Sequence, residues 1–304
     1  MQPKYTFGEV DILLVDSDLG SRNGVRTILS NNGFSNVTLG TELSKIRDVL
    51  TGGVPDLIIT GMEFPDGNIT DILPDIRNSK LGHNPFVPVI VILDQTTPEM
   101  IAALMNAGPD DVVMKPISTK GLLQRMHKQI HKRRPFIVTE KYLGPARKGD
   151  DLSHGVDPPN PLYLKATGGK VSFMEIERMV EAAKQSVEER KLENQGPEIA
   201  ALVGRLTPML DKPQISQSAI GGLNMLIDLN TQVISQLEGS KYDHVQELCK
   251  ALVTVSKRLS ETTGSPDPQQ VKLLKPLSQA IQAGFAGGIN SADAARMIVK
   301  QIGV

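Results

Sequence analysis

The sequence predicts an α/β domain with a doubly wound, five-stranded parallel sheet, followed by an all-α helical bundle. Two observations support this prediction. In residues 1–134, short apolar segments alternate with stretches of helical periodicity, whereas residues 173–304 have helical periodicity throughout. Residues 135–172, a basic arm and a Pro/Gly-rich linker, separate them. A chain of 304 residues is long enough for two hydrophobic cores, so we predict two domains joined by this linker.

Each predicted strand is a short run of mainly apolar residues. The first, residues 10–15, contains one polar residue, Asp11, which is typical of a strand with both faces buried. The other four segments are 36–39, 56–60, 87–93 and 111–114. Because parallel strands are joined by crossovers, helices should cover both faces of the sheet. The ligand site of such a sheet lies at the carboxyl ends of its strands.

The segments between the predicted strands have the spacing of amphipathic helices. Residues 22–29 and 100–107 show it, and Thr97 followed by Pro98 predicts where the second of these helices starts. Residues 120–134 should form a further helix. Its apolar side consists of Leu122, Leu123, Met126 and Ile130.

The composition excludes several classes of protein. A net charge of −1 argues against a chain built as one large basic surface for nucleic acid. Cys249 is the single cysteine, so we expect no disulfide framework and no zinc finger. Five scattered histidines predict no metal cluster. No apolar segment approaches the roughly 20 residues of a membrane span, and we expect a cytoplasmic protein.

The charge is unevenly distributed along the chain. Residues 1–118 carry 15 acidic and 8 basic side chains, whereas residues 119–170 carry 4 acidic and 11 basic ones. The basic segment 120–148 is interpreted either as the solvated end of a helix or as a surface for an anionic partner, an acidic protein or a nucleic acid. A membrane surface is the least favoured partner.

Four segments at the ends of the predicted strands resemble the receiver domain of two-component response regulators, over about residues 9–134. They are ILLVDSD at 12–18, PDLIITGMEFPDGN at 55–68, PVIVIL at 88–93 and AGPDDVVMKPI at 107–117. Each segment is a weak signal alone, but all four occur in the order and spacing of the family. The resemblance implies a flavodoxin-like, CheY-like fold and a role in phosphorelay signal transduction.

The resemblance also implies a chemistry, and most of its residues are absent from this chain. Receivers accept a phosphoryl group on an aspartate after the third strand, beside a magnesium ion held by an acidic pair after the first strand. The acceptor position is Gly61, which offers no oxygen, and the second position of the acidic pair is Ser17. Leu93 replaces the phosphate-binding hydroxyl, and Val112 replaces the aromatic switch residue. We expect no catalytic residue and no cofactor, Mg²⁺ included.

Two residues of the implied pocket remain, Asp16 and Lys115. We interpret them as a partly buried ion pair, in which removal of one partner would leave an uncompensated charge. Alternatively, Lys115 is retained only for the bend that it forms with Pro116. Glu63, two residues after the acceptor position, is a candidate mimic of a charged acceptor, although a solvated loop glutamate is the simpler interpretation.

The segment RPFIVTEKYLGPARK, residues 134–148, is similar to a tail that follows the receiver in a subset of bacterial stand-alone response regulators. We expect this arm to be packed on the receiver or presented by it. The candidate partner-binding residues are Arg133, Arg134, Phe136, Tyr142 and Arg147. Residues 149–171 are predicted to be a semi-extended linker without regular structure that spaces the two halves apart.

The last part of the chain has helical seams but no enzyme signature. Segments 174–192, 220–237, 245–259 and 274–285 repeat apolar residues at steps of three and four, and Asn290-Ser291 predicts a final helix toward Ile302. Because prolines and glycines interrupt the pattern, we predict a small bundle of short helices. Asn230 lies in an apolar stripe, and we interpret it as solvated or, alternatively, as fixing the register of a helix pair.

These observations favour a phosphorylation-independent signalling adaptor of a two-component system, not an enzyme. It would act by binding signalling or kinase-associated proteins, and self-association through the C-terminal helices is left open. The alternative is a nucleic-acid-associated regulator that uses residues 120–148. For that function we expect the logarithm of the binding affinity to fall linearly with the logarithm of the salt concentration.

Overall fold

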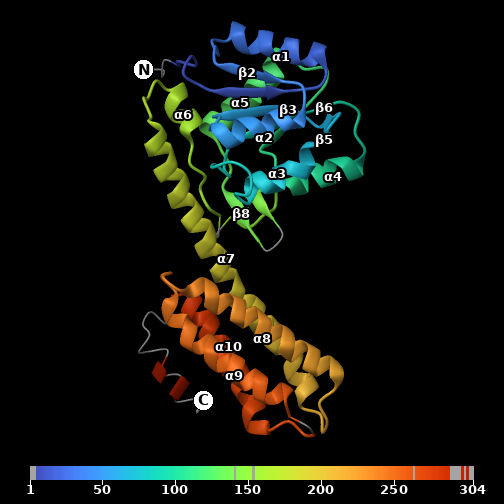
Figure 1. Cartoon of the computed structure of the whole chain (residues 1–304), viewed down its shortest axis with the longest axis vertical. Helices are drawn as coiled ribbons and strands as arrows, with labels where there is room; N and C mark the ends of the chain where they lie inside the picture. Colours follow the sequence, from blue (N-terminus) through green and yellow to red (C-terminus); the bar gives the residue numbers. More distant parts are fainter. Residues whose placement is uncertain are drawn as a thin grey trace. The chain divides into compact units, whose positions relative to one another are not determined.

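A computed structural model describes residues 5–139, 142–152, 155–262, 264–287, 296–297 and 299–300 (Figure 1). The chain forms two compact units, Met1–Val187 and Glu188–Val304. The division falls within helix α7 (Phe173–Leu210), not between residues 172 and 173 as predicted. The reason is that the first turns of α7 bury Ile176 and Val180 against Phe86 in the first unit.

The first unit is built on a five-stranded parallel sheet, as predicted. Its strands are β1 (Ile12–Val15), β2 (Val37–Gly40), β3 (Leu57–Gly61), β6 (Val89–Leu93) and β7 (Asp111–Met114), in the order β2-β1-β3-β6-β7. The register pairs Val15 with Gly40 and Thr60, and Leu93 with Met114. The carboxyl ends of the strands therefore lie along one edge of the sheet.

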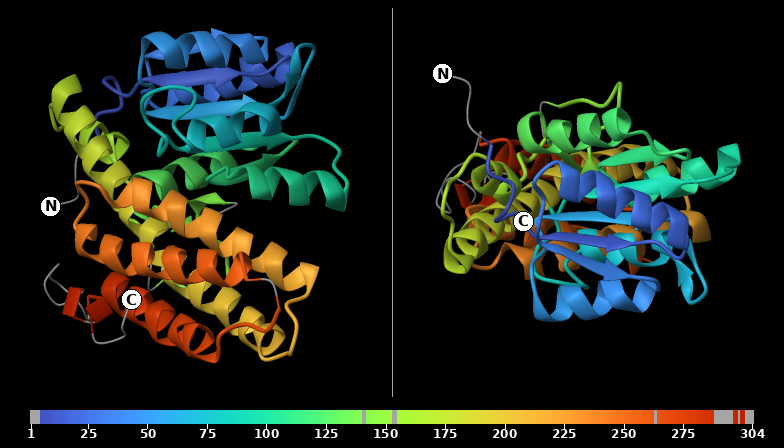
Figure 2. Two further views of the ribbon diagram at one scale, coloured as in Figure 1. Left: turned by 60° about the horizontal axis from the view of Figure 1, so that its bottom comes forward. Right: turned by 90° about the horizontal axis from the view of Figure 1, so that it is seen from above.

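Helices cover both faces of this sheet, which Figure 2 shows from two further directions. Apolar residues of α1 (Leu19–Asn31) and α5 (Thr119–His131) pack on one face. Those of α2 (Leu43–Gly52), α3 (Ile69–Arg77) and α4 (Pro98–Ala107) pack on the other. The predicted cap is present, since the Thr97 side chain accepts a hydrogen bond from the Met100 amide. Helix α5 ends three residues before its predicted end, at His131.

A small hairpin after β3 was not predicted. Strands β4 (Glu63–Phe64) and β5 (Gly67–Asn68) form it, and Asp66 lies at its turn. The two carboxylate oxygens of Asp66 accept hydrogen bonds from the amides of Leu43 and Ser44, each at 2.8 Å. These bonds hold the pKa of Asp66 below its usual value. Asp66 therefore caps α2 from a distant part of the sequence.

The prediction that residues 149–171 have no regular structure was wrong, because they contain a helix. Residues 136–138 and 143–145 form a hairpin, β8 (Phe136–Val138) and β9 (Leu143–Pro145), and α6 (Pro161–Ala166) follows. Leu162 and Ala166 of α6 are buried in the core beneath α1 and α5. Lys165 Nζ lies 2.8 Å from carboxylate oxygens of both Asp11 and Asp56. Apolar burial and these ion pairs fix the segment to the first unit.

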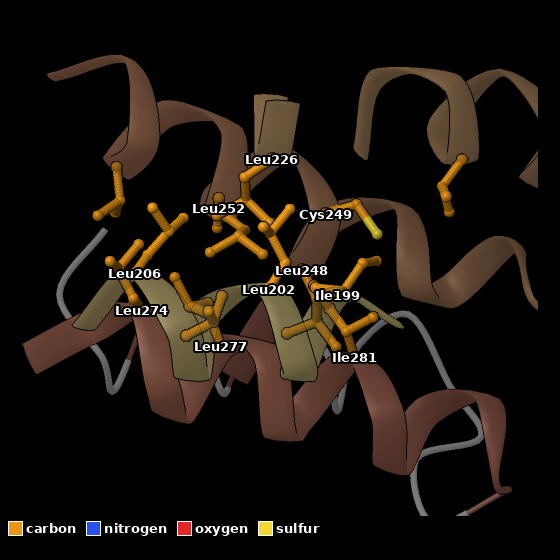
Figure 3. Close-up of a cluster of buried hydrophobic side chains, with 14 of the residues drawn as sticks. Ile199, Leu202, Leu206, Leu226, Leu248, Cys249, Leu252, Leu274, Leu277 and Ile281 are labelled. Carbon is orange, nitrogen blue, oxygen red and sulfur yellow. The ribbon is translucent and has the colours of Figure 1, made fainter. Parts of the chain in front are cut away.

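The second unit is a helical bundle, as predicted, formed by the remainder of α7 with α8 (Gln217–Leu237), α9 (Gln246–Ser260) and α10 (Pro268–Phe285). A 3-10 turn, η1 (Asp243–Val245), precedes α9. Figure 3 shows the side chains of this core, with labelled residues from all four helices. Helix α7 is much longer than its predicted segment 174–192, because it continues through Pro197 and Pro208. Among the described helices, none combines the length and the apolar character that a membrane crossing requires.

Asn230 is fully buried in this core, so the interpretation as a solvated residue was wrong. Its Nδ2 donates to the carbonyl oxygen of Leu226 one turn earlier, at 2.8 Å. Its Oδ1 has no hydrogen-bond partner among the described residues. The predicted helix start at Asn290-Ser291 and its end near Ile302 lie outside the described residues.

Candidate functional site

The residues singled out by the sequence meet at the carboxyl edge of the sheet. Asp16 follows β1, Gly61 ends β3, Leu93 ends β6 and Lys115 follows β7. All four line a cavity of about 200 Å³. Its remaining lining residues are Ser17, Asp18, Met62, Glu63, Ile92, Asp94, Gln95, Thr96 and Met100.

Asp16 is the buried charge of this cavity, with 3% of its surface exposed. Its Oδ1 accepts a hydrogen bond from the Asp18 amide at 2.9 Å. Its Oδ2 has no hydrogen-bond partner among the described residues and lies 3.8 Å from Lys115 Nζ. The two retained residues thus form an ion pair, but at a separation that is too long for a hydrogen bond.

Gly61 leaves open the place from which an acceptor side chain would extend. A Cβ atom built on Gly61 would lie 3.2 Å from Oδ1 of Asp16. Ser17 has no carboxylate with which to complete an acidic pair, and its Oγ donates to the main-chain oxygen of Glu63 at 3.2 Å. The Glu63 side chain is exposed, and the described residues contain no ion pair between Glu63 and Lys115. In this structure Glu63 therefore does not take the place of an acceptor carboxylate.

The residues present do not fit the magnesium ion of an active receiver. Mg²⁺ requires near-octahedral oxygen ligands and is usually bound through one or two carboxylates together with the substrate's phosphate oxygens. Here Asp16 supplies one buried carboxylate, Gly61 supplies none, and Ser17 is turned toward a main-chain oxygen. Among the described residues, no three or more His, Cys, Asp or Glu side chains are placed so that together they could hold a metal ion.

Apolar side chains occupy the positions where a receiver has its hydroxyl and aromatic switch groups. Leu93 is 2% exposed and belongs to the core beneath α2, α3 and α4. Met100 of α4 and Val112 of β7 pack against the same core. Neither Leu93 nor Val112 can donate a hydrogen bond to a phosphate oxygen. Close packing of this kind favours one arrangement of the strand end and of the adjacent helix.

The opposite edge of the sheet holds a second buried charged cluster, which we call the Asp110 cluster: Arg77, Asp110 and Arg133. Asp110 Oδ2 accepts from Arg77 Nη2 and from the Val89 amide, both at 2.8 Å. Asp110 Oδ1 lies 3.3 Å from Arg133 Nη2. Burial lowers the pKa of both arginines, and the charge of Asp110 opposes this effect. One carboxylate thus compensates two buried guanidinium groups.

The Asp110 cluster also fixes the arm. Phe136 is fully buried, and the guanidinium carbons of Arg77 and Arg133 lie 5.3 Å and 5.9 Å from the centre of its ring. Arg133 also donates to the main-chain oxygens of Phe86 and Pro159, at 2.6 Å and 2.7 Å. Of the two expectations for the arm, the structure shows packing on the receiver.

The other candidate partner-binding residues are also engaged inside the first unit. Arg147 Nη2 donates to the main-chain oxygens of Met105 and Pro109, and the Tyr142 hydroxyl donates to that of Pro145. Arg134 is exposed, although its Nη1 donates to the Ala146 oxygen. The Arg-Pro-Phe and Tyr-x-Gly-Pro segments of the sequence therefore belong to an arm that is packed on the first unit. Of the five candidate partner-binding residues, Arg134 is the most accessible.

Many basic side chains of segment 120–148 also make contacts within the first unit. Lys128 lies 2.9 Å and Arg125 lies 3.7 Å from carboxylate oxygens of Asp111. Three exposed lysines of segment 120–148 have no ion pair among the described residues: Lys120, Lys132 and Lys148. They remain as separate charges on a unit that also carries many acidic side chains.

Comparison with known proteins agrees with this fold. Residues 12–127 match the family model of the response regulator receiver domain. Response regulator MprA of Mycobacterium tuberculosis (strain ATCC 25177 / H37Ra) is 28% identical over 131 residues, which cover 43% of this chain and 55% of MprA. MprA of Mycobacterium sp. (strain KMS) is 28% identical over 126 residues, which cover 41% of this chain and 53% of that protein. The chain thus spans about half the length of these relatives.

Solved receiver structures are also similar to this chain. A CheY-like receiver domain protein of Methanospirillum hungatei JF-1 is 22% identical, with a TM-score of 0.36 over 40% of this chain and 92% of that chain. A receiver protein of Pseudomonas putida is 22% identical, with a TM-score of 0.35 over 39% of this chain and 96% of that chain. From the family match and the strand order together, residues 12–127 of this chain are a response regulator receiver domain, the domain type of two-component signalling.

Proposed function

We propose that this protein is a phosphorylation-independent signalling adaptor, which acts by binding other proteins and has no enzymatic activity of its own. The observation that carries this proposal is Gly61 at the acceptor position, next to the buried carboxylate of Asp16. An acyl phosphate needs a carboxylate oxygen at that position, and a hydrogen atom supplies none. The receiver would therefore be recognised in one fixed conformation.

The apolar replacements support the same proposal. In a responsive receiver, a phosphate-bound hydroxyl and a mobile aromatic side chain link the pocket to an output surface. Leu93 and Val112 have no donor that a phosphate could attract, and both pack against the core. A ligand that makes no differential contact with two conformations cannot shift their equilibrium. The proposed adaptor therefore works without an Mg²⁺ or phosphate signal.

The surface formed by α4, β7 and α5 supports a protein partner. Ile101 of α4 and Met114 of β7 are 42% and 49% exposed, which is high for large apolar side chains. Contact with a protein partner would remove both side chains from water. We propose that signalling or kinase-associated proteins bind here. Self-association through the helical bundle and a cytoplasmic location stay predictions.

The alternative function, binding of nucleic acid through residues 120–148, has less support. Arg125, Lys128, Arg133 and Arg147 all make contacts within the first unit, so these charges are already partly or fully compensated. Nucleic-acid binding draws its affinity from many free cations that follow the phosphate backbone. A fluorescence-anisotropy titration with duplex DNA at several salt concentrations tests this alternative, and a linear fall of log affinity with log salt would favour it.

The proposal is tested by treating the full chain with acetyl phosphate and Mg²⁺, and separately with beryllofluoride and Mg²⁺. We expect no phosphoryl adduct in intact-mass spectra and no saturable change in the amide NMR spectrum near Gly61 and Lys115. A receiver with an aspartate acceptor, treated in parallel, shows that the reagents are active. A labile phosphoryl adduct on a carboxylate of the cavity would overturn the proposal.

A further inference from the structure

We propose that the cavity at the carboxyl edge of the sheet receives a cationic side chain, an arginine or a lysine, of the protein partner. This inference rests on the proposed adaptor function, because it assigns a binding role to the pocket that phosphate no longer uses. The recognised chemistry is a guanidinium or ammonium group at the end of a flexible aliphatic stem.

The charge of the cavity favours a cation. Four carboxylates line it, and Lys115 is the single lining cation. The carboxylates are Asp16, Asp18, Glu63 and Asp94. Within the described part of the chain, only Asp16 of these four has an ion pair within 4 Å. The nearby Arg22 does not line the cavity, and its Nη1 donates to the main-chain oxygen of Asp16 at 2.6 Å. The lining therefore keeps an excess of negative charge, which attracts a positive ligand.

The buried acceptor gives the cavity a specific contact for such a ligand. Asp16 is 97% buried, as its exposed fraction is 3%, and its Oδ2 has no hydrogen-bond partner. The ammonium of Lys115 lies 3.8 Å away, and its side chain is 23% exposed, so it has room to move aside. A guanidinium could donate two hydrogen bonds to one carboxylate, and such charge-assisted bonds are roughly twice as strong as neutral ones.

The shape of the cavity suits a side chain that carries its charge at the end of an apolar stem. Gly61 and Ser17 lie beside Asp16 in the lining of a cavity of about 200 Å³. Met62, Leu93 and Met100 form apolar parts of the lining. The methylene groups of arginine or lysine can pack along such walls while the charged head reaches a carboxylate. Phosphate, by contrast, would meet four carboxylates.

The test is an amide NMR titration of the full chain with Nα-acetyl-arginine amide and, separately, Nα-acetyl-lysine amide. The neutral isostere Nα-acetyl-citrulline amide is the ligand control, and Mg²⁺ is titrated as a competing cation. We expect saturable shifts confined to the amides of Asp16, Asp18, Gly61 and Lys115 with a cationic probe, and none with citrulline. The stronger of the two cationic probes identifies guanidinium or ammonium as the preferred group.

Two variants locate the contact, and a third controls for surface charge. Asp16→Asn should weaken binding of the cationic probe at least 10-fold, because it removes the buried charge. Gly61→Leu should abolish binding by filling the cavity. The φ of Gly61 is not positive, so the backbone allows a side chain, but the new Cβ would lie 3.2 Å from Asp16 Oδ1 and the Asp16 carboxylate would have to shift slightly. Glu9→Gln removes an exposed carboxylate outside the cavity and should leave binding unchanged. If Asp16→Asn unfolds the chain, Gly61→Leu alone decides the result.

Equal shifts with citrulline, or no shifts with either cationic probe, would overturn the inference. Shifts with Mg²⁺ and none with the organic cations would also overturn it. These failures are distinct from failure of the adaptor proposal, because that proposal is tested by acetyl phosphate. A chain that neither binds the probes nor accepts phosphate contradicts only the inference about the cavity.

Discussion

Substitution of Asp110 should cost the first unit far more stability than its position in a loop suggests. Asp110→Asn leaves Arg77 and Arg133, whose side chains are 1% and 5% exposed, without their shared counter-charge. Breaking a buried ion pair by removal of one partner costs about 3–5 kcal/mol. Asparagine retains an oxygen for the Val89 amide, so the loss is mainly electrostatic. For a unit of this size, such a cost corresponds to a fall of roughly 6–20 °C in the unfolding midpoint.

The neighbouring carboxylate provides a matched control. Asp111 is bound by Arg125 and Lys128, but these two side chains are 36% and 34% exposed. Partly exposed pairs contribute about 0–1 kcal/mol, so Asp111→Asn should shift the midpoint by only a few degrees. Thermal unfolding of the full chain by circular dichroism measures both variants. Hydrogen exchange at the Val89 amide then separates unfolding of the first unit from that of the bundle.

Equal effects of Asp110→Asn and Asp111→Asn would refute this reasoning. Such a result would mean that water or a shift of the arm compensates the two arginines as well as Asp110 does. Detachment of the arm without unfolding would be visible as rapid exchange of the Phe136 amide, which donates to the Val156 oxygen at 2.7 Å. That outcome would place the energetic role of the cluster in arm docking and not in folding.

Three further predictions follow from other parts of the chain. Asp66→Ala removes the cap of α2, so the free energy of unfolding should fall by about 0.5–2 kcal/mol, measured by urea denaturation with Glu9→Ala as a control. Burial, and secondarily His127, lower the pKa of His131, so its neutral form is favoured in the folded state. The contribution of neutral His131 to the free energy of unfolding should be complete above pH 6.5 and should decline as the pH falls below that value. An NMR titration in which His131 ionises above pH 6.5 would contradict this prediction. Asn230→Leu should raise the bundle's free energy of unfolding by about 1–3 kcal/mol, because it removes a buried unpaired oxygen, and a lower midpoint in urea would argue against it.

The sheet could be predicted because its signals are local and agree with one another. Apolar runs such as 87–93 are bounded by loop residues, and the predicted strand limits differ from the observed ones by only a few residues. The carboxyl-edge site followed from topology, since parallel strands bring Asp16, Gly61 and Lys115 together wherever the helices lie. The lack of a hydrogen bond to Oδ2 of Asp16 could not be predicted, because it depends on the conformation of the Lys115 side chain, whose Nζ lies 3.8 Å away.

The hairpin of the arm, α6 and the extension of α7 beyond residue 192 were missed because these features depend on tertiary contacts. Prolines in 158–161 suggested an irregular linker, yet Pro161 occupies the first turn of α6, where its missing amide is not needed. Pro197 likewise lies within a long helix, where packing outweighs the lost hydrogen bond. Next to it, a Cβ on Gly196 would lie 3.1 Å from Gln282 Cα, so α7 and α10 approach closely there.

The buried carboxylates at the two edges of the sheet differ in how closely cationic side chains compensate their charge, and this difference is relevant to function. At the amino edge, Asp110 receives two guanidinium groups and Asp56 receives Lys165 at 2.8 Å. At the carboxyl edge, Asp16 has one ammonium at 3.8 Å and an oxygen with no donor. A carboxylate buried with so little compensation destabilises the free protein, and a structural role alone would be served better by an apolar residue. If a partner supplies a cation to Asp16, the new ion pair offsets the free-energy cost of burying this carboxylate, and this gain adds to the affinity of the complex.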